Sequence, residues 1–217
     1  MAIWMHWLNV LSGLLEFLSS RAGFGEGVAI IALTLMVRTA LLPLSWSSAY
    51  RGLIRQKKIL ALQPELQRLK ERFAGQPRAY ADRMVALYRR HDIAVADVSG
   101  LIGALVQAPV LLGLYQTLRR GVHGRFLWVK DLSRPDIGLA VLAGLATMLL
   151  ALINPDLPEH MRLILILVPA VVTIVVALKV ASALSLYWAA SNCYAGIQTA
   201  VLHRLISIRI RSGALKI

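Results

Sequence analysis

A single arginine, Arg38, lies inside an apolar stretch, where a charged side chain could attract an acidic group. It follows eleven residues of the stretch 27–44, so it lies roughly 16 Å along a helix that rises 1.5 Å per residue. An arginine at this depth in a membrane costs about 2.5–3.5 kcal/mol, and such a residue usually faces a wet cavity lined by protein. Thr34 lies one turn earlier on the same face. This position favours an aqueous pocket around Arg38, with Thr34 on the same face of the helix.

The charge of Arg38 has two interpretations, and the residues leave both open. None of the apolar stretches contains Asp or Glu, so the guanidinium has to be hydrated or to meet an acidic group of another molecule. Alternatively, the side chain extends to the cytoplasmic interface, because about six residues separate it from that end of the stretch.

Further polar residues occur at helical spacing in the last apolar stretch, 180–202. Ser185, Trp188 and Asn192 fall on one helical face. Such a face can line the same groove, or it can pack against another helix through hydrogen bonds. Gln107, in an earlier apolar stretch, has the same two interpretations.

Catalytic and metal-binding chemistry has no support in the sequence. The histidines have no ligand spacing, and Cys193 is the only cysteine, which excludes an internal disulfide and a cysteine-rich zinc site. There is no Ser/His/Asp set, phosphate-binding loop or pair of intramembrane carboxylates. We expect a protein that is not an enzyme and that holds no metal and no cofactor.

The composition is typical of a membrane protein with basic loops. Of the 217 residues, 58% are hydrophobic and 16% are charged, against about 45–50% and about 25% in soluble domains. Lys and Arg number 24 and Asp and Glu number 11, which gives a net charge of +13. This combination excludes a disordered chain, a collagen and an ordinary soluble enzyme, and it predicts cationic cytoplasmic loops.

The elements that must position these residues are predicted to be helices. Residues 1–26 carry Leu and Trp at helical spacing and are expected to form an amphipathic helix in the membrane interface, with a sixth, partly inserted span as the alternative. Only Lys179 separates the last two apolar stretches, which predicts a tight hairpin. The expected fold is an all-α polytopic membrane protein. Its five spans, of roughly 17–25 residues each, are predicted at 27–44, 98–118, 137–153, 163–178 and 180–202.

The distribution of Lys and Arg predicts the orientation in the membrane. Sixteen of these 24 residues lie on one side of the membrane, the side that holds the loop after the first span and the tail 204–217. Seven lie on the other side, and Arg38 lies within a span. The positive-inside rule therefore places the N-terminus outside and the short basic tail in the cytoplasm. The sequence shows neither a basic region of a cleavable signal nor an Arg- and Ser-rich transit peptide. We expect the bacterial inner membrane.

The long basic loop, 50–91, is predicted to form a helical hairpin. Apolar residues spaced 3, 4, 3 and 4 run from Ile59 to Phe73, residues 74–77 break the chain, and Pro64 is expected to kink or restart the first helix. The outer face is cationic, and it either docks on lipid head groups, ribosomal RNA or an acidic partner or only sets the orientation. The candidate contact residues are Arg51, Arg55, Lys57, Lys58, Arg68, Lys70 and Arg72.

Six motifs occur in order along the chain. They are GVAIIALTLMVRTALLPLS, which contains Arg38, then ALQPELQRLKERF, MVALYRRH, LVQAPVLLGLYQTL, FLWVKDLSRPD, and LSLYWAASN followed by Gln198. From about Gly23 to His203, their order and spacing resemble those of the YidC/Oxa/Alb membrane protein insertases. The chain resembles a short member of this family, without a large periplasmic domain.

The resemblance implies a five-span core, 27–203, that encloses a hydrophilic groove open to the cytoplasm and to lipid. Arg38 would draw the polar, often acidic, tail of a client protein into the groove, with Thr34 as its neighbour and Trp188 as a client contact. The hairpin 50–91 would receive clients and face the ribosome or the Sec channel.

The expected function is that of an insertase, which moves short hydrophilic segments of client proteins across the membrane and releases their transmembrane segments to lipid. Its partners would be nascent membrane proteins and membrane lipids, with the ribosome and the Sec translocon as candidates, and neither DNA nor a small-molecule substrate. One alternative is a membrane-anchored protein that binds the ribosome, RNA or a partner through the basic hairpin. The other is a small transporter, which would show inverted repeats or further intramembrane charges.

Overall fold

Helices make up most of the described part of the chain. The computed structural model describes residues 2–95, 108, 112–113, 115–117, 124–153 and 161–215. Over these residues there is no strand, and Phe126 and Val129 form an isolated antiparallel bridge. The all-α class expected from the sequence is therefore confirmed. Gln107 and most of the predicted span 98–118 lie outside the described residues.

The chain divides into two compact units, and each is described by itself. The first contains Met1–Pro43 and Leu105–Ala200, and the second contains Leu44–Ala104 and Val201–Ile217. Arg38 lies in the first unit, whereas the basic hairpin lies in the second.

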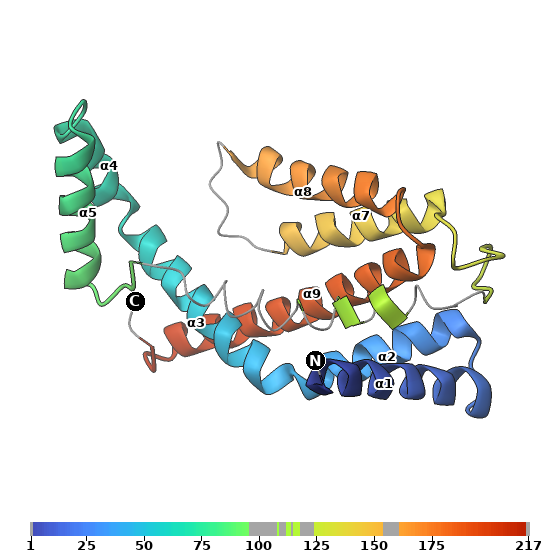
Figure 1. Ribbon diagram of the computed structural model, residues 1–217. Coiled ribbons are helices and arrows are strands. Elements are labelled where there is room, and N and C mark those ends of the chain that lie inside the picture. The colour runs from blue at the N-terminus through green and yellow to red at the C-terminus, as the bar shows by residue number, and fades with distance from the viewer. Residues whose placement is uncertain are drawn as a thin grey trace. The chain divides into compact units, whose positions relative to one another are not determined.

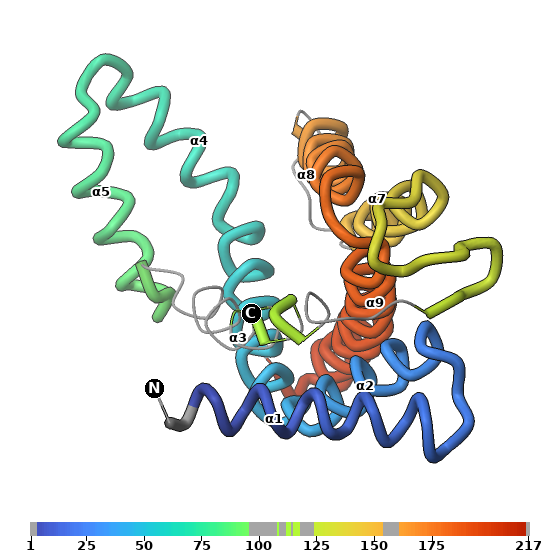
Figure 2. The backbone as a smooth tube through the Cα atoms, turned by 45° about the vertical axis from the view of Figure 1, so that its right-hand side comes forward, coloured from blue at the N-terminus to red at the C-terminus, as the bar shows by residue number. Residues whose placement is uncertain are grey.

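The first unit begins with two helices that lie side by side (Figure 2). α1 (Ala2–Glu16) continues into a wider π-helical turn, η1 (Phe17–Arg21), and α2 (Glu26–Ala40) follows. Leucines three or four residues apart form one apolar face of α1 and η1, as the sequence pattern predicts. This face packs on α2, and the buried residues of the contact are Leu11, Leu15, Leu18, Ala29, Ile30 and Leu33.

Among the residues that the structure describes, α7 (Ile137–Leu152), α8 (Arg162–Ala177) and most of α9 (Ser182–Arg211) also belong to the first unit. α7 and α8 run side by side (Figure 1), and α9 follows α8 after the turn 178–181. This turn agrees with the tight hairpin expected at Lys179. α9 continues past the predicted end of the last stretch, to Arg211. It ends just before Gly213, whose φ of 73° is readily adopted by glycine.

The predicted stretch 27–44 is not one continuous helix. α2 ends at Ala40, and α3 (Leu42–Ala61) begins beyond Leu41 with Pro43 as its second residue. Proline lacks the N–H that a helix interior needs but is tolerated in the first turn, so Pro43 starts a new helix. In the described part of the chain, no single helix is both long and apolar enough to cross a membrane. α2 and α3 taken together, across the bend between them, meet both conditions.

A loop over 124–136 joins the beginnings of α2 and α9. The backbone N–H of Gly124 donates to Glu26 Oε2 at the start of α2, at 2.7 Å. The N–H of Ser182 donates to the Arg134 carbonyl at 2.9 Å, and the N–H of Ala183 to the Leu132 carbonyl at 3.0 Å. The loop therefore holds the first residues of both helices at one end of the unit. Residues at a similar distance along α2 and α9 consequently lie at a similar depth in the unit.

Asp136 caps α7, and replacing it with alanine is expected to destabilise the fold by about 0.5–2 kcal/mol. Its Oδ1 accepts hydrogen bonds from the Leu139 N–H at 2.8 Å and from Trp128 Nε1 at 3.1 Å, and alanine leaves both donors without this acceptor. Asp136→Ser keeps a capping oxygen and should recover most of the loss. Thermal denaturation of the purified chain in detergent measures the effect. Equal melting temperatures for wild type and Asp136→Ala would contradict this role.

The second unit contains most of α3, the hairpin helices and the end of α9. α4 (Gln63–Arg72) begins with Pro64 as its second residue, so the restart expected at Pro64 is observed. α5 (Pro77–Arg90) follows a turn that includes Gly75 at a φ of 83°, which glycine adopts without a side-chain clash. Figure 1 shows α4 and α5 as an antiparallel pair. Their small apolar core consists of Leu62, Leu87 and Ile93, flanked by Ile59, Leu66, Leu69 and Tyr88.

Candidate functional site

Arg38 lies in the last turn of α2, and its side chain is half-buried. Its Nε donates a hydrogen bond to Ser191 Oγ of α9 at 3.4 Å, and Ser191 is only 1% exposed. The loop over 124–136 explains why these residues meet. Arg38 lies roughly 18 Å along α2 from Glu26, and Ser191 roughly 14 Å along α9 from Ser182, so both occur at a similar depth below the loop that joins the two helix beginnings.

No carboxylate is close enough to neutralise Arg38 in the described residues. The guanidinium makes no ion pair there. α7, α8 and α9 contain no Asp or Glu, and the acidic residue of α2, Glu26, lies at its opposite end. A guanidinium carries five N–H donors, and the structure gives a partner to the Nε–H. The Nη groups are therefore left for water or for an anionic group of another molecule.

Thr34 and Ser185, which the sequence predicts to line the groove, are both fully buried. Thr34 Oγ1 donates to the Ile30 carbonyl at 2.6 Å, one turn earlier on α2, so its hydrogen is used within its own helix. Ser185 Oγ has no hydrogen-bond partner among the described residues. The structure does not pair either hydroxyl with Arg38, although Thr34 shares a helix face with it.

Trp188 and Asn192 lie one turn apart on α9, and both contact α7. Trp188 is half-buried and packs on a cluster that includes Ala143 and Ala146. Asn192 Nδ2 donates to Thr147 Oγ1 at 2.7 Å. Their contacts are thus with α7, whereas Ser191, on the neighbouring face of α9, contacts Arg38.

A chain of polar side chains links α9, α7 and α8. Beyond its bond from Asn192, Thr147 Oγ1 lies 2.9 Å from the Ala143 carbonyl and 3.3 Å from Thr173 Oγ1 of α8, and Thr173 is 4% exposed. The hydroxyls and the amide satisfy one another inside an apolar bundle. Such bonds fix which helix faces meet, because the unpaired alternative leaves polar atoms without partners.

We expect Asn192→Ala and Thr147→Val each to destabilise the protein by about 0.6 kcal/mol and by no more than about 1.7 kcal/mol, the average and the maximum for hydrogen bonds between helices in membrane proteins. Because both changes break the same bond, the double variant should lose less than the sum of the two. Denaturant titration of wild type, the two single variants and the double variant in mixed micelles measures the four free energies of unfolding for this double-mutant cycle. Strictly additive losses would show that the bond contributes nothing.

Sequence reasoning missed several of these residues. Ser191 is adjacent to Asn192, but it lies off the face that contains Ser185, Trp188 and Asn192, and only that face shows a polar pattern. Thr147 and Thr173 could have been found, because each is a lone hydroxyl in an apolar helix. The bond from Tyr194 OH to Thr39 Oγ1, at 3.4 Å, joins α9 to α2 beside Arg38 and carried no sequence signal.

The predicted contact residues of the hairpin have different environments. Arg55 Nε donates to the Ala94 carbonyl at 3.0 Å, and Lys58 Nζ to the His91 carbonyl at 3.3 Å, so both hold the segment that follows α5. Arg68, Lys70 and Arg72 are exposed, as is Arg51, whereas Lys57 is half-buried.

No metal centre is present in the described ranges, where no three His, Cys, Asp or Glu side chains gather closely enough to hold an ion. Cys193, next to Asn192 on α9, is a free and exposed thiol. The site therefore consists of one cation, hydroxyls and an amide, which can attract and hydrogen-bond a polar segment.

Known proteins match this sequence over most of its length. The family model described as 60Kd inner membrane protein matches residues 17–209. The chain is 29% identical over 190 residues to the membrane protein insertase YidC of Staphylococcus aureus strains JH9, Newman and MW2, which covers 80% of this chain. The chain spans 65% of the length of these curated relatives. Since the family match includes α2 with Arg38 and α9 through Arg209, the protein belongs to the 60Kd inner membrane protein family, the family of YidC.

Proposed function

We propose that the protein is a membrane protein insertase. It moves short hydrophilic segments of client proteins into and across the membrane through a hydrated groove, and it releases their transmembrane segments to lipid. Arg38 attracts an acidic client tail, and Trp188 and Asn192, on the face of α9 that meets α7, contact the client. Thr34 and Ser185, which are fully buried, form the polar backing of the groove, and Gln107 is a further groove residue. It needs no cofactor and turns over no chemical substrate.

The observation that carries the proposal is the uncompensated charge of Arg38. A guanidinium held by one hydrogen bond to Ser191, with no carboxylate near it in the described helices, is costly in an apolar bundle unless water or an anion reaches it. A groove that admits water shortens the low-dielectric path that a polar segment has to cross. The same groove admits the carboxylates of an acidic tail, which would then pair with Arg38.

The proposed setting follows from the family and from the charges. The chain lies in the bacterial inner membrane as a five-span protein, with its N-terminus outside and the tail 204–217 in the cytoplasm. Residues 1–26 lie in the interface, and the hairpin 50–91 faces the cytoplasm. Nascent membrane proteins and lipids are the partners, with the ribosome and the Sec translocon as candidates.

Reconstitution tests the proposal directly. The purified chain in vesicles of phosphatidylethanolamine and phosphatidylglycerol is mixed with a synthesised single-span client whose short N-terminal tail carries acidic residues, and protease protection measures how much of the tail crosses. We expect the protected fraction to rise several-fold over that in vesicles without protein. A protected fraction equal to that of the empty vesicles, with the protein correctly folded by circular dichroism, would overturn the proposal.

A further inference from the structure

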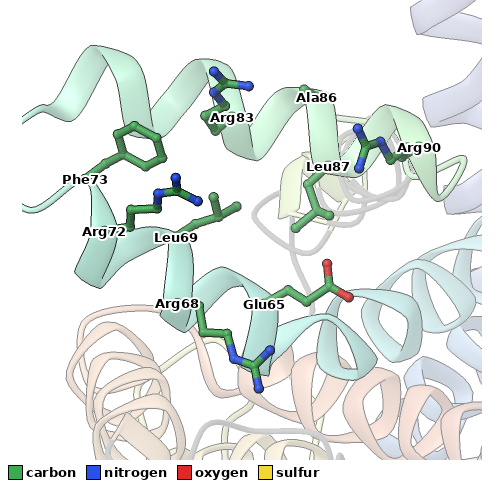
Figure 3. Close-up of a pocket in the computed structure, with 9 residues that line it drawn as sticks. All are labelled: Glu65, Arg68, Leu69, Arg72, Phe73, Arg83, Ala86, Leu87 and Arg90. Carbon is green, nitrogen blue, oxygen red and sulfur yellow. The ribbon is translucent and has the colours of Figure 1, made fainter.

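The hairpin carries a groove between its two helices that is unrelated to Arg38 (Figure 3). The groove encloses about 410 Å³, which is within the range of ligand pockets in proteins. α4 contributes Arg68 and Arg72 to it, and α5 contributes Arg83 and Arg90. Each pair is spaced by one or two helical turns, so each helix presents one continuous face to the groove.

The four arginines lie along the groove and do not converge on one point. Arg68 and Arg72 are roughly 6 Å apart along α4, and Arg83 and Arg90 roughly 10 Å apart along α5. All four are exposed, and none makes an ion pair or a hydrogen bond with the described residues. Their donors are therefore available to a ligand that carries several negative charges in a row, whereas a single phosphate could reach only some of them.

The floor of the groove is apolar. It is formed by Leu69 of α4 and Leu87 of α5, with Phe73 at the end nearest the turn. Ala86 is an exposed small residue of α5 that also lines the groove, so another backbone can approach closely there. A trough with an apolar floor between two antiparallel helices has the shape in which a third, amphipathic helix packs.

From this complementarity we infer that the hairpin groove binds an amphipathic helix of a partner protein, with an apolar stripe on the floor and Asp or Glu residues facing the four arginines. Glu65 lies at the end of the groove away from the turn and is the acidic member of its lining. It fixes the direction of the bound helix, because a basic residue of the partner pairs with it there. The inference goes beyond the proposed function, since it concerns the hairpin by itself.

RNA fits this groove less well than an acidic helix does. Binding of single-stranded nucleic acid relies on several aromatic side chains on which bases stack, and the groove offers Phe73 while the rest of its floor is aliphatic. A lipid surface would contact the outer cations of the hairpin equally with those of the groove. Binding of RNA and binding of a lipid surface would both depend on the charge of the hairpin and not on the apolar floor of the groove.

Fluorescence anisotropy of the whole 217-residue chain in detergent tests the inference. The probe is a labelled helical peptide of about 18 residues, which is long enough to form a helix, with leucines at i, i+3, i+4 and i+7, flanking glutamates and one terminal lysine. The groove variant Arg72→Glu/Arg83→Glu should weaken binding by about tenfold or more. The matched variant Arg78→Glu/Arg89→Glu changes the net charge equally, on exposed positions of α5 outside the groove, and should change binding by less than about threefold. Equal loss in the two variants would overturn the inference.

A charge-neutral pair of variants separates shape from charge. Ala86→Trp fills the groove and should abolish binding of the peptide, whereas Ala81→Trp, on the exposed surface of α5 away from the groove, should leave it intact. Circular dichroism checks that each variant remains helical. If a peptide of the same composition in scrambled order binds as tightly, the inference is wrong. Tighter binding of a polyuridine oligonucleotide or of phosphatidylglycerol vesicles than of the helical peptide, with sensitivity to the groove variants, would also overturn it.

Discussion

Replacing Arg38 with alanine is expected to reduce insertion of a client with an acidic tail by about 10- to 100-fold. A hydrogen bond to a charged group contributes about 1.5–3 kcal/mol, and each 1.4 kcal/mol corresponds to a factor of about ten. Alanine removes the charge and all five donors, and the described helices around it offer no second cation at that depth. Cells depleted of their own insertase, complemented with the variant, provide the measurement through protease protection of the client tail.

Two controls test whether the positive charge of Arg38, and not another property of its side chain, accounts for the loss of insertion. Arg38→Lys keeps a positive charge while losing the Nε donor, and we expect it to retain most of the activity. A client whose tail acids are replaced by Gln and Asn should depend on Arg38 far less than the acidic client does. If wild type, Arg38→Ala and Arg38→Lys insert both clients equally well at equal membrane levels, Arg38 is not the charge that attracts the client.

Replacing Gly144 with valine should substantially lower the stability of the first unit. A side chain at Gly144 would overlap the side chain of Ile174 on α8 and would come within 3.2 Å of the Ala170 carbonyl. Overpacking of this kind costs about 1–3 kcal/mol, which corresponds to a fall of about 2–12 °C in melting temperature for a chain of this size. The contact depends on small residues because α7 and α8 approach closely there, as is common between membrane helices.

A second-site change provides the test of this mechanism. Ile174→Ala removes the atoms that valine would strike, so the double variant Gly144→Val/Ile174→Ala should be more stable than Gly144→Val alone. The matched control is Gly13, an exposed residue of α1 at which an added Cβ would have no neighbouring atom within 4 Å. Gly13→Val should change the melting temperature little. Failure of Ile174→Ala to restore any stability would show that the loss arises from another cause.

The features that the sequence predicts well are local ones. The helical class, the restart at Pro64, the turn around Gly75 and the turn at Lys179 each depend on a few neighbouring residues whose backbone preferences are strong. The expectation of one continuous helix over 27–44 is wrong. Hydropathy averages over residues and does not register that Pro43 lacks the N–H donor of a helix interior and is favoured in the first turn of a new helix.

The partners of the candidate site could not be predicted in the same way. Ser191 and Arg38 are 153 residues apart in sequence, and Gly124 and Glu26 are 98 apart, so no local pattern connects them. A helical periodicity identifies which residues share a face, but it does not say which neighbouring helix that face meets. Trp188 and Asn192 were correctly grouped with each other by their spacing, yet their contacts lie on α7 and away from Arg38.

Cys193 gives the protein a built-in reporter. The chain has one cysteine, exposed on α9 and next to Asn192, so a maleimide dye attaches at a single known position without any engineered substitution. Maleimides react with the thiolate, and a thiol in hydrocarbon remains protonated and inert. The rate of labelling in vesicles therefore reports whether this turn of α9 meets water or acyl chains, and a change in that rate when client is added would show that the client alters the surroundings of this turn.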